Sequence, residues 1–476
     1  LAGGALTVSL LPQLTGLYAR LDREAGAEVG AHPDVDALFS KIASAMLAAV
    51  VVLVVVAEIY TESLVGLWVD GFDAAAIAQT ATLTRIVLPA QIFFLSGGLI
   101  QAALLARQRF AALALTPLCY NGGIIVGGLV ATATGDVSAF SWGALVGAAI
   151  GALLVPAIFA RGVLRFMPRI PTFDADVRRF AWTALPLMIG VSLTTVDEWL
   201  GVRYGSRIGD GGISWLGSAR RLLLVPIGLV GTAAGQATGA FVARLHAEGR
   251  RDELAALLGR ALGAVAAISL LLSGFAWAAA EPIVGVLFEH GRFTRADTLQ
   301  TAVLLQAMAP AIAGWGLHSV AARSLYGTGD TWRPMLASSV VTALSLPLYA
   351  LLSERAGLTG LAWAGVVGMS GQGIAMCWLT RRRLGLQTPA LLLAVARALP
   401  VALIAGAIAR YVVDAVLAAV SVAAVAPGAT AYLLALLAAA LVWLVAVAAL
   451  GTVFAVPGLA EVGKRLRSRV WRRPRA

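Results

Sequence analysis

Residues 213–242 read ISWLGSARRLLLVPIGLVGTAAGQATGAFV, an apolar run long enough to cross a bilayer, with Arg220 and Arg221 side by side within it. A cation at the middle of a membrane helix costs roughly 2.5–3.5 kcal/mol, so such residues normally face a protein interior or a water-filled cavity. The planar guanidinium matches phosphate and carboxylate oxygens, and two of them together predict a docking point for an anion. The alternative is that both side chains lie near a helix end and reach the membrane interface.

The rest of the chain has the composition of a membrane protein. Its 476 residues are 59% hydrophobic and 13% charged, whereas soluble domains are typically about 25% charged. The 51 glycines suit membrane helices that approach one another closely. A membrane β-barrel would instead show segments of roughly ten residues with alternating hydrophobicity. The sequence therefore predicts an all-α, polytopic membrane protein with no separate soluble domain.

Apolar runs of about 20 residues give the positions of the predicted spans. The thirteen candidates are 1–18, 42–60, 83–106, 112–132, 138–160, 180–202, 213–242, 259–288, 299–322, 335–353, 357–380, 393–415 and 430–456. The first residue is Leu and no basic segment precedes the first run, so no signal peptide is visible. We expect this start to be an internal cut, with one more helix upstream.

The basic residues predict the orientation of these spans. Alternate loops place 26 of the 36 Lys and Arg residues on one side of the membrane and five on the other. Because basic loops mark the cytoplasmic side, the C-terminus is predicted to be cytoplasmic, with the basic tail at 457–476 against anionic headgroups. Arg85 begins a span and is expected to reach the interface. The net charge of +11 is thus a topology signal, and we expect no nucleic-acid partner.

No pattern of an enzyme or a metal site is present in the sequence. It contains no P-loop, GxSxG, HExxH or CxxC motif, and its four histidines lack metal-ligand spacing. Cys119 and Cys377 lie inside apolar runs and are expected to pack as small hydrophobes. The charged clusters at 22–24 and 250–253 are expected to be solvated loops. We therefore predict a protein that is no enzyme and needs neither a metal nor an organic cofactor.

Two carboxylates lie just before the arginine-bearing run. Asp197 and Glu198 fall inside the apolar stretch at 181–202. An intramembrane carboxylate pair could balance the charge of Arg220 or Arg221, or couple transport to a cation or to protons. A position near the outer interface is the third alternative. Adjacent helical positions point about 100° apart, so the two carboxylates are expected to have different roles.

A faint internal repeat suggests how the spans are grouped. The tripeptide ARL ends the first run at 19–21 and the seventh at 243–245, which is 224 residues later. Arg107 and Arg323, 216 residues apart, end the third and ninth runs. Two six-helix halves of the same orientation explain this spacing, and chance agreement among helices that end in arginine is the alternative. The predicted division is an N-terminal lobe at 1–179, a C-terminal lobe at 180–385, two further helices at 386–456 and the tail at 457–476.

Six stretches of the chain carry motifs of a known family. They are LAGGALTVSLLP (1–12), RIVLP (85–89), RFAALALTPLCYN (109–121), SARRLLLVPIGLVGTA (218–233), LFEHGRFTRADT (287–298) and ARSLYGTGDTWRP (322–334). These stretches resemble the MurJ (MviN) lipid II flippases of the multidrug/oligosaccharidyl-lipid/polysaccharide exporter superfamily, and SARRLLLVPIGLVGTA is similar to the family's YADRLxxxPxGxxGxA. They keep the order of the family from residue 1 to about 385, and the last two helices match in hydrophobicity alone.

The resemblance implies fourteen helices, as two six-helix lobes plus two C-terminal helices. It implies a flippase that moves lipid-linked peptidoglycan precursor, a lipid-linked oligosaccharide, across the bacterial inner membrane by alternating access. The family's essential arginine falls on Arg221, which would engage the pyrophosphate beside Arg220. Transport would be driven by a coupling cation or by the membrane potential. We expect a monomer that contacts membrane lipids, with peptidoglycan synthesis proteins as candidate partners.

The chain departs from the family pattern at several positions. The family's first helix and the arginine-bearing stretch before its second helix are absent, and Gly3 stands where the family has Glu. Arg220 replaces a common Asp, and Ser345 and Tyr349 hold polar positions linked to cation binding, which argues against sodium coupling. The rival hypotheses are an exporter of another polyprenyl-linked glycan or of a drug, and a non-transporting scaffold for envelope assembly.

Overall fold

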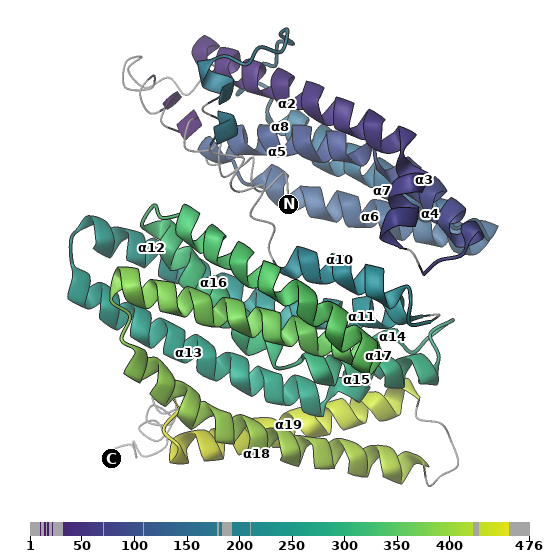
Figure 1. Cartoon of the computed structure of the whole chain (residues 1–476), viewed down its shortest axis with the longest axis vertical. Helices are drawn as coiled ribbons and strands as arrows, with labels where there is room; N and C mark the ends of the chain where they lie inside the picture. Colours follow the sequence, from purple (N-terminus) through teal and green to yellow (C-terminus); the bar gives the residue numbers. More distant parts are fainter. Residues whose placement is uncertain are drawn as a thin grey trace, which may run out of the picture. The chain divides into compact units, whose positions relative to one another are not determined.

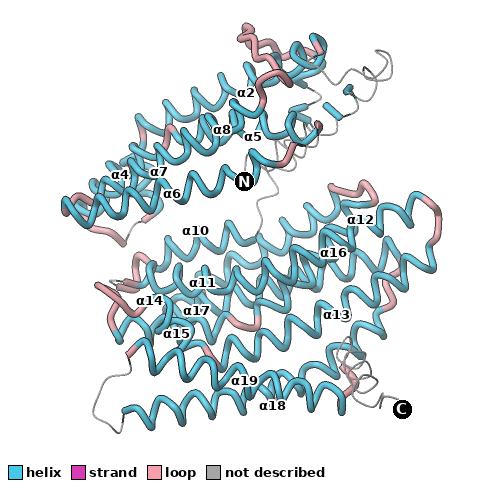
Figure 2. Tube along the Cα trace, turned by 180° about the vertical axis from the view of Figure 1, so that it is seen from behind, coloured by secondary structure: helices cyan, strands magenta, loops and turns pink. Residues whose placement is uncertain are grey.

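The computed structural model describes most of the chain and divides it into two units. The described residues are 10, 14–15, 17–18, 21, 32–69, 71–107, 109–178, 180–182, 193–209, 211–421 and 428–456. Within them the regular secondary structure is entirely helical (Figure 2), which confirms the predicted all-α class. Contacts along the chain separate a first compact unit, Leu1–Gly190, from a second, Val191–Ala476.

The first unit holds the helices drawn in purple to blue in Figure 1. They are α2 (Pro33–Ile59), α3 (Thr61–Trp68), α4 (Ala74–Val87), α5 (Ala90–Ala106), α6 (Ala111–Thr134), α7 (Ser138–Ala148), the π-helical turn η1 (Ala149–Leu154) and α8 (Val155–Phe159). The run predicted at 83–106 is interrupted at Leu88 and Pro89, because proline has no N–H to continue the helix of α4. At η1 the carbonyl of Gly151 accepts a hydrogen bond from the Thr116 hydroxyl of α6, at 2.8 Å.

Small residues bring α6 and α7 into close contact. A Cβ atom added at Gly123 would lie 2.4 Å from the carbonyl oxygen of Gly143, and one added at Gly127 would lie 2.4 Å from that of Ala139. No real side chain tolerates such distances, so glycine is required at both positions. Membrane helices use small residues at this kind of interface because lipid supplies no hydrophobic drive to associate.

The second unit holds the remaining helices. They are α10 (Leu193–Gly205), α11 (Gly212–Ile227), the π-helical turn η2 (Gly228–Thr232), α12 (Ala233–Ala247), α13 (Arg251–Ala278), α14 (Ala280–Phe288), α15 (Arg295–Met308), α16 (Ala311–Gly327), α17 (Trp332–Leu384), α18 (Thr388–Ser421) and α19 (Ala429–Val453). The predicted run 213–242 is thus one helical path through α11, η2 and α12. In Figure 1, α18 and α19 lie side by side along α13.

The helix α17 consists of two antiparallel halves. Its 53 residues would extend about 80 Å as one straight helix, far beyond the roughly 30 Å hydrocarbon core of a bilayer. The backbone leaves helical geometry at Ala356 and Gly357, where Gly357 has φ +57°. Beyond this turn, the Gln372 amide donates to the Ser338 carbonyl oxygen and to the Thr342 hydroxyl, both at 3.3 Å. The two halves therefore match the separate runs predicted at 335–353 and 357–380.

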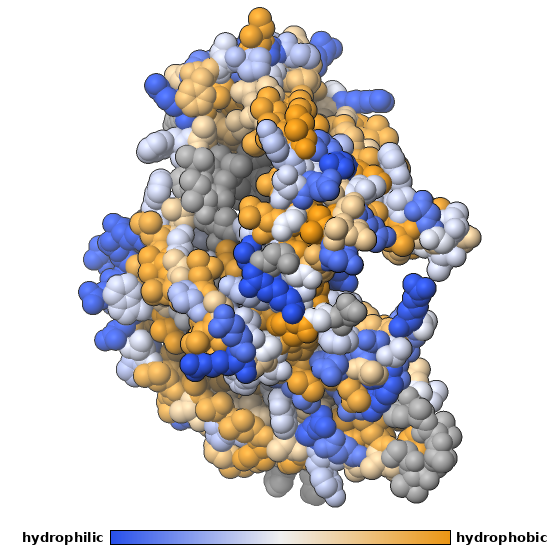
Figure 3. All heavy atoms as spheres, turned by 45° about the vertical axis from the view of Figure 1, so that its right-hand side comes forward, coloured by the Kyte–Doolittle hydropathy of each residue, from blue (hydrophilic) through white to orange (hydrophobic). Residues whose placement is uncertain are grey.

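The structure confirms that the chain is built for a membrane. Nine helices of the described part are long and apolar enough to span a bilayer, or ten when α15 and α16, bent by 49°, count as one span. Apolar side chains cover much of the face shown in Figure 3. The thirteen predicted spans stay a prediction as a number, and so do the boundaries of the predicted lobes. The run at 1–18 lies largely, and the tail at 457–476 wholly, outside the described residues.

Candidate functional site

An ion pair inside the second unit joins α10 to α11. The Arg220 guanidinium places Nη2 2.6 Å and Nε 2.8 Å from Oδ2 of Asp197, and Nη2 also donates to the Asp197 carbonyl oxygen at 3.1 Å. The side chains are 13% and 5% exposed. Of the three alternatives for Asp197, charge balance with an arginine is therefore the arrangement present. Each charge is held inside the fold only because the other neutralises it.

A third helix completes this pair. The Tyr349 hydroxyl of α17 donates to Oδ1 of Asp197 at 2.5 Å, so both carboxylate oxygens are occupied. Gly365, in the second half of α17, allows the approach, because a Cβ atom there would lie 2.8 Å from Oδ1 of Asp197. Ser345 is not part of this network, since its hydroxyl donates to the Val341 carbonyl oxygen of its own helix. We refer to Asp197, Arg220 and Tyr349 as the buried triad.

The neighbouring charged residues lie on the other side of the same helices. Arg221 and Glu198 are exposed, and neither has an ion-pair or hydrogen-bond partner among the described residues. The exposed side of α11 carries Arg221 together with the apolar Leu224 and Val225. Adjacent residues of a helix point about 100° apart, so the side chains of Arg220 and Arg221 lie in different surroundings. The four predicted site residues thus form one buried pair and two exposed single charges, and their roles in binding and coupling stay predictions.

The stretch LFEHGRFTRADT anchors the start of α15. Thr294 and Asp297 form a capping box, in which the Thr294 hydroxyl and the Asp297 carboxylate satisfy free backbone N–H groups at the helix N-terminus. The other Asp297 oxygen accepts a hydrogen bond from Nε1 of Trp215 at 2.8 Å, which ties α15 to α11. The T-x-x-D spacing is a helix-start signal in the sequence, and it explains why α15 begins at Arg295, four residues before the predicted span 299–322. Part of this stretch therefore positions the helix that carries the arginines.

The same stretch also binds the C-terminal helices. Arg295 forms an ion pair with Glu281 of α14 at 2.6 Å and a hydrogen bond with the Tyr432 hydroxyl of α19. Tyr432 in turn donates to Glu289 at 2.8 Å. These contacts link the first residue of α15 to α14, to the residue that follows α14 and to α19. Sequence reasoning missed them because Tyr432 lies 137 residues from Arg295.

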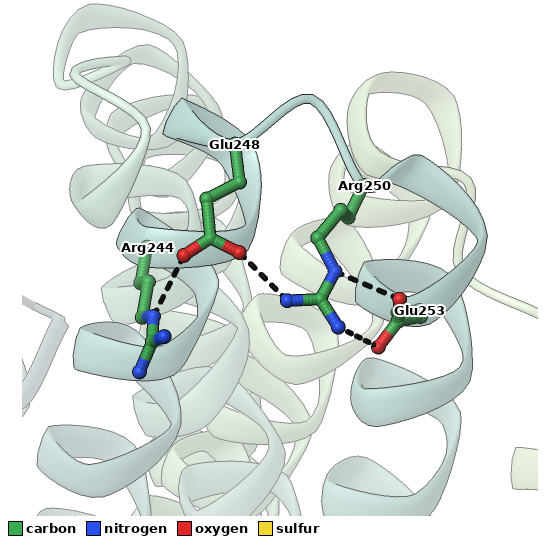
Figure 4. Close-up of polar contacts among 4 residues, drawn as sticks. All are labelled: Arg244, Glu248, Arg250 and Glu253. Atoms are coloured by element: carbon green, nitrogen blue, oxygen red, sulfur yellow. Dashed lines mark hydrogen bonds and ion pairs between the residues drawn. The ribbon is translucent and has the colours of Figure 1, made fainter.

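A second arginine network lies at the connection between α12 and α13 (Figure 4). Glu248 accepts from Nε of Arg244 at 2.8 Å and from Nη1 of Arg250 at 2.7 Å, while Arg250 also pairs with Glu253 at 2.6 Å. The two arginine side chains are 72% and 46% exposed, and residues 250–253 are solvated as predicted. The prediction of a loop is wrong, because Arg251, Asp252 and Glu253 form the first turn of α13, where acidic residues are favoured at the helix N-terminus. The two arginine hydrogen bonds hold the pKa of Glu248 below its usual range. We refer to these four residues as the surface network.

Within the ranges that the structure describes, no group of three His, Cys, Asp or Glu side chains could hold a metal ion. Cys377 is buried among apolar side chains of α13 and α16, as expected for a small hydrophobe. Of the two arginines predicted for the site, Arg221 is the one that is exposed and has no ion-pair partner among the described residues.

Comparison with known proteins identifies the family. A family model described as "Lipid II flippase MurJ" matches residues 1–428. The probable lipid II flippase MurJ of Bdellovibrio bacteriovorus is 27% identical over 333 residues, covering 66% of this chain and 61% of that protein. The one from Thermotoga maritima is 26% identical over 313 residues, covering 66% and 63%. The chain thus spans less than two thirds of the length of these relatives.

Solved structures show the same fold. A lipid II flippase MurJ in an inward closed conformation superimposes with a TM-score of 0.74, at 19% identity, over 95% of this chain and 88% of that one. An inward-facing multidrug resistance MATE transporter of the MOP superfamily gives 0.64, at 16% identity, over 81% and 87%. At these identities the likeness concerns the fold alone. Because the family model covers most of its length, the chain belongs to the MurJ lipid II flippase family.

Proposed function

We propose that this protein is a flippase that moves lipid II across the bacterial inner membrane by alternating access, and that Arg221 binds the diphosphate of the substrate. Family membership and the many membrane-spanning helices support transport without a chemical step. The chain matches only part of its relatives' length, so their activity is extended to it here as part of the proposal. The fold likeness to MATE transporters fits the same mode of transport.

The contrast between Arg220 and Arg221 carries the assignment of the site. The guanidinium of Arg220 makes three polar contacts with Asp197, all within 3.1 Å, and its side chain is largely buried. The guanidinium of Arg221 is exposed and makes no ion pair with any described residue. A charge on an apolar membrane helix is costly, and a ligand of opposite charge offsets that cost. Arg221 is therefore available for an anion, whereas Arg220 supports the helix that presents it.

The chemistry of the substrate requires such a group. A diphosphate cannot cross hydrocarbon unaided, because burial of its charge without a partner costs many kcal/mol. The planar guanidinium offers two parallel donors to phosphate oxygens, which lysine cannot reproduce. Arg220 belongs to the site as the neighbour that fixes the position of α11. Asp197 then acts as an internal counter-ion, which leaves the exposed Glu198 as the carboxylate for cation or proton coupling.

The orientation and assembly of the protein are part of the same proposal. The distribution of basic residues over alternate loops supports a cytoplasmic C-terminus. Transport is driven by the membrane potential or by a cation that Glu198 binds, and the protein works as a monomer in contact with membrane lipids. Proteins of peptidoglycan synthesis are its proposed partners.

The test measures binding and flipping of lipid II by variants of Arg221. The purified chain is reconstituted in liposomes, and flipping of fluorescent lipid II is followed for wild type, Arg221→Ala and Arg221→Lys. Loss of a charged hydrogen bond corresponds to about 1.5–3 kcal/mol, so we expect Arg221→Ala to bind lipid II roughly 10- to 100-fold more weakly. The affinity of Arg221→Lys should lie between those of wild type and Arg221→Ala, because lysine keeps the positive charge but lacks the two parallel donors of the guanidinium.

Arg292→Ala is the matched control, since Arg292 is an exposed arginine outside the helices. It should flip lipid II at the wild-type rate. Equal flipping by Arg221→Ala and Arg292→Ala would refute the role of Arg221 while leaving the transport activity standing. No flipping by the wild-type chain, under conditions in which a MurJ relative flips, would refute the proposed function itself.

A further inference from the structure

An extended segment in the first unit is fastened along α2. Residues 164–173, which we call the strap, follow α8 and have no regular secondary structure. The backbone N–H groups of Arg165, Met167 and Arg169 donate in turn to α2 side chains. Their acceptors are the Asp36 carboxylate at 2.8 Å, the Ser40 hydroxyl at 3.0 Å and the Ser44 hydroxyl at 3.0 Å.

The spacing of these bonds explains the fit between the strap and the helix. Four residues of extended chain advance about 13 Å, and eight residues of α-helix advance about 12 Å, so every second N–H meets every fourth side chain. The acceptors are buried, with Asp36 4%, Ser40 0% and Ser44 7% exposed. Buried polar groups are costly unless they are satisfied, so the strap is required at this place. It is a fixed part of the unit.

Lys41 of α2 binds the two acidic residues that follow the strap. Its Nζ lies 2.9 Å from Asp174 and 3.0 Å from Asp176. The arginines of this region differ, since their guanidinium groups have no ion-pair partner among the described residues. They are Arg161, Arg165, Arg169 and Arg178, all of them exposed. The surface of the strap thus carries an uncompensated positive charge.

Large apolar side chains are exposed beside these arginines. Ile170 is 87% and Phe173 73% exposed, and Trp182, shortly after the strap, is 72% exposed. Aromatic rings and long apolar side chains next to cations are typical of segments at the boundary between headgroups and acyl chains. The basic loops assign this connection to the cytoplasmic side, where anionic lipids make the surface potential negative.

An apolar cavity opens under the strap. It has a volume of about 420 Å³, within the roughly 300–1,000 Å³ of small-molecule sites. Its walls come from α2, α5, η1 and α8, for example Ala43, Leu99 and Ala157, and the strap residues Leu164 and Phe166 also line it. Arg165 lies between these last two residues. The short segment that lines this hydrocarbon space therefore also carries an arginine without an ion-pair partner among the described residues.

We propose that this place is a binding site for an anionic phospholipid of the surrounding membrane. The acyl chain occupies the cavity, and the phosphate of the headgroup lies on Arg165 and Arg169 of the strap. Basic pockets at the cytoplasmic ends of membrane helices bind anionic headgroups by the same charge complementarity. The site is separate from Arg221 and does not depend on the transport activity. It makes the first unit sensitive to the composition of the cytoplasmic leaflet.

The test compares two lipids that differ in the headgroup alone. The purified chain in detergent is titrated with phosphatidylglycerol or phosphatidylcholine of identical acyl chains, and bound lipid is measured by native mass spectrometry. We expect phosphatidylglycerol to bind at least tenfold more tightly. Each arginine near an anionic surface changes affinity on the order of fivefold, so Arg165→Gln with Arg169→Gln should remove most of this preference.

Two controls separate the site from general effects. Arg292→Gln with Arg355→Gln removes the same net charge from other exposed arginines and should keep the preference. Ala157→Phe fills the cavity and should weaken the binding of both lipids without changing their ratio. Soluble glycerol phosphate should not compete, because it lacks the acyl chain.

Three outcomes would overturn the proposal. One is equal binding of the two lipids by the wild-type chain. Another is an equal loss of preference in both double variants, which would indicate net charge alone. The third is displacement of phosphatidylglycerol by glycerol phosphate at the same concentration, which would indicate a site for free anions.

Discussion

Two arginine networks of the second unit have nearly the same contact distances and different surroundings. The buried triad joins Arg220 to Asp197 at 2.6 Å, and the surface network joins Arg250 to Glu253 at 2.6 Å. The side chains of the first pair are 13% and 5% exposed, whereas those of the second are 46% and 59% exposed. Distance alone therefore says little about what an ion pair contributes, and burial decides it.

The difference follows from what happens when one partner is removed. In the surface network, water and salt replace the lost partner, so exposed pairs contribute little. In the buried triad, removal of one charge leaves the other enclosed without compensation. The triad thus holds α10, α11 and α17 in one arrangement. Arg221, on the exposed side of α11, is positioned by this arrangement and keeps its own charge available.

The largest effect is expected for Asp197→Ala. It leaves the Arg220 guanidinium enclosed without a counter-ion, and breaking a buried pair in this way costs about 3–5 kcal/mol. The melting temperature of the purified chain in detergent measures the loss. Glu198→Ala is the matched control, because the neighbouring carboxylate is exposed and unpaired, and it should change stability by less than about 0.5 kcal/mol.

The double variant Asp197→Leu with Arg220→Met sharpens this prediction. An apolar pair of similar volume often replaces a buried ion pair without loss, so most of the stability should return. Equal melting temperatures for Asp197→Ala and Glu198→Ala would show that the buried triad contributes no more than a surface charge.

A smaller effect is expected for Tyr349→Phe. The variant removes the hydroxyl that donates to Asp197 at 2.5 Å and keeps the ring in its place. Hydrogen bonds to charged groups contribute about 1.5–3 kcal/mol, so the loss should be about half that of Asp197→Ala. Tyr411→Phe, at a side chain that is 75% exposed, is the control and should melt with wild type. If the two variants behave alike, α17 is not fastened through this hydroxyl.

The fold was largely predictable because hydrophobicity alone marks membrane helices. The runs at 112–132 and 430–456 correspond closely to α6 and α19. The breaks were less visible, because a helix that is apolar on all sides carries no periodicity that marks a bend. The chain interrupts the run 83–106 at Pro89 and bends by 49° between α15 and α16. Proline marks both positions, since Pro89 precedes α5 and Pro310 precedes α16, whereas the size of each bend depends on packing between helices.

The candidate site was predictable in composition and not in arrangement. Charged side chains inside an apolar run are costly, and for this reason Arg220, Arg221, Asp197 and Glu198 could be picked out from the sequence. Which arginine pairs with which carboxylate depends on helix rotation, and Tyr349 joins the triad from 152 residues away. The strap is a similar case. The four-residue spacing of Asp36, Ser40 and Ser44 is plain in the sequence, but their donors lie more than 120 residues further along the chain.

The smallest effect is expected for Glu248→Gln in the surface network. The hydrogen bonds from the two arginines hold the pKa of the Glu248 carboxyl below its usual range, so its contribution to stability is present at neutral pH and disappears as the pH falls through the lowered pKa. The melting temperatures of wild type and Glu248→Gln should differ slightly at neutral pH and low salt, and converge in acid or in about 1 M salt. A difference that persists in acid and in high salt, or one as large as that of Tyr349→Phe, would contradict the comparison, because the exposed pair would then behave as a buried one.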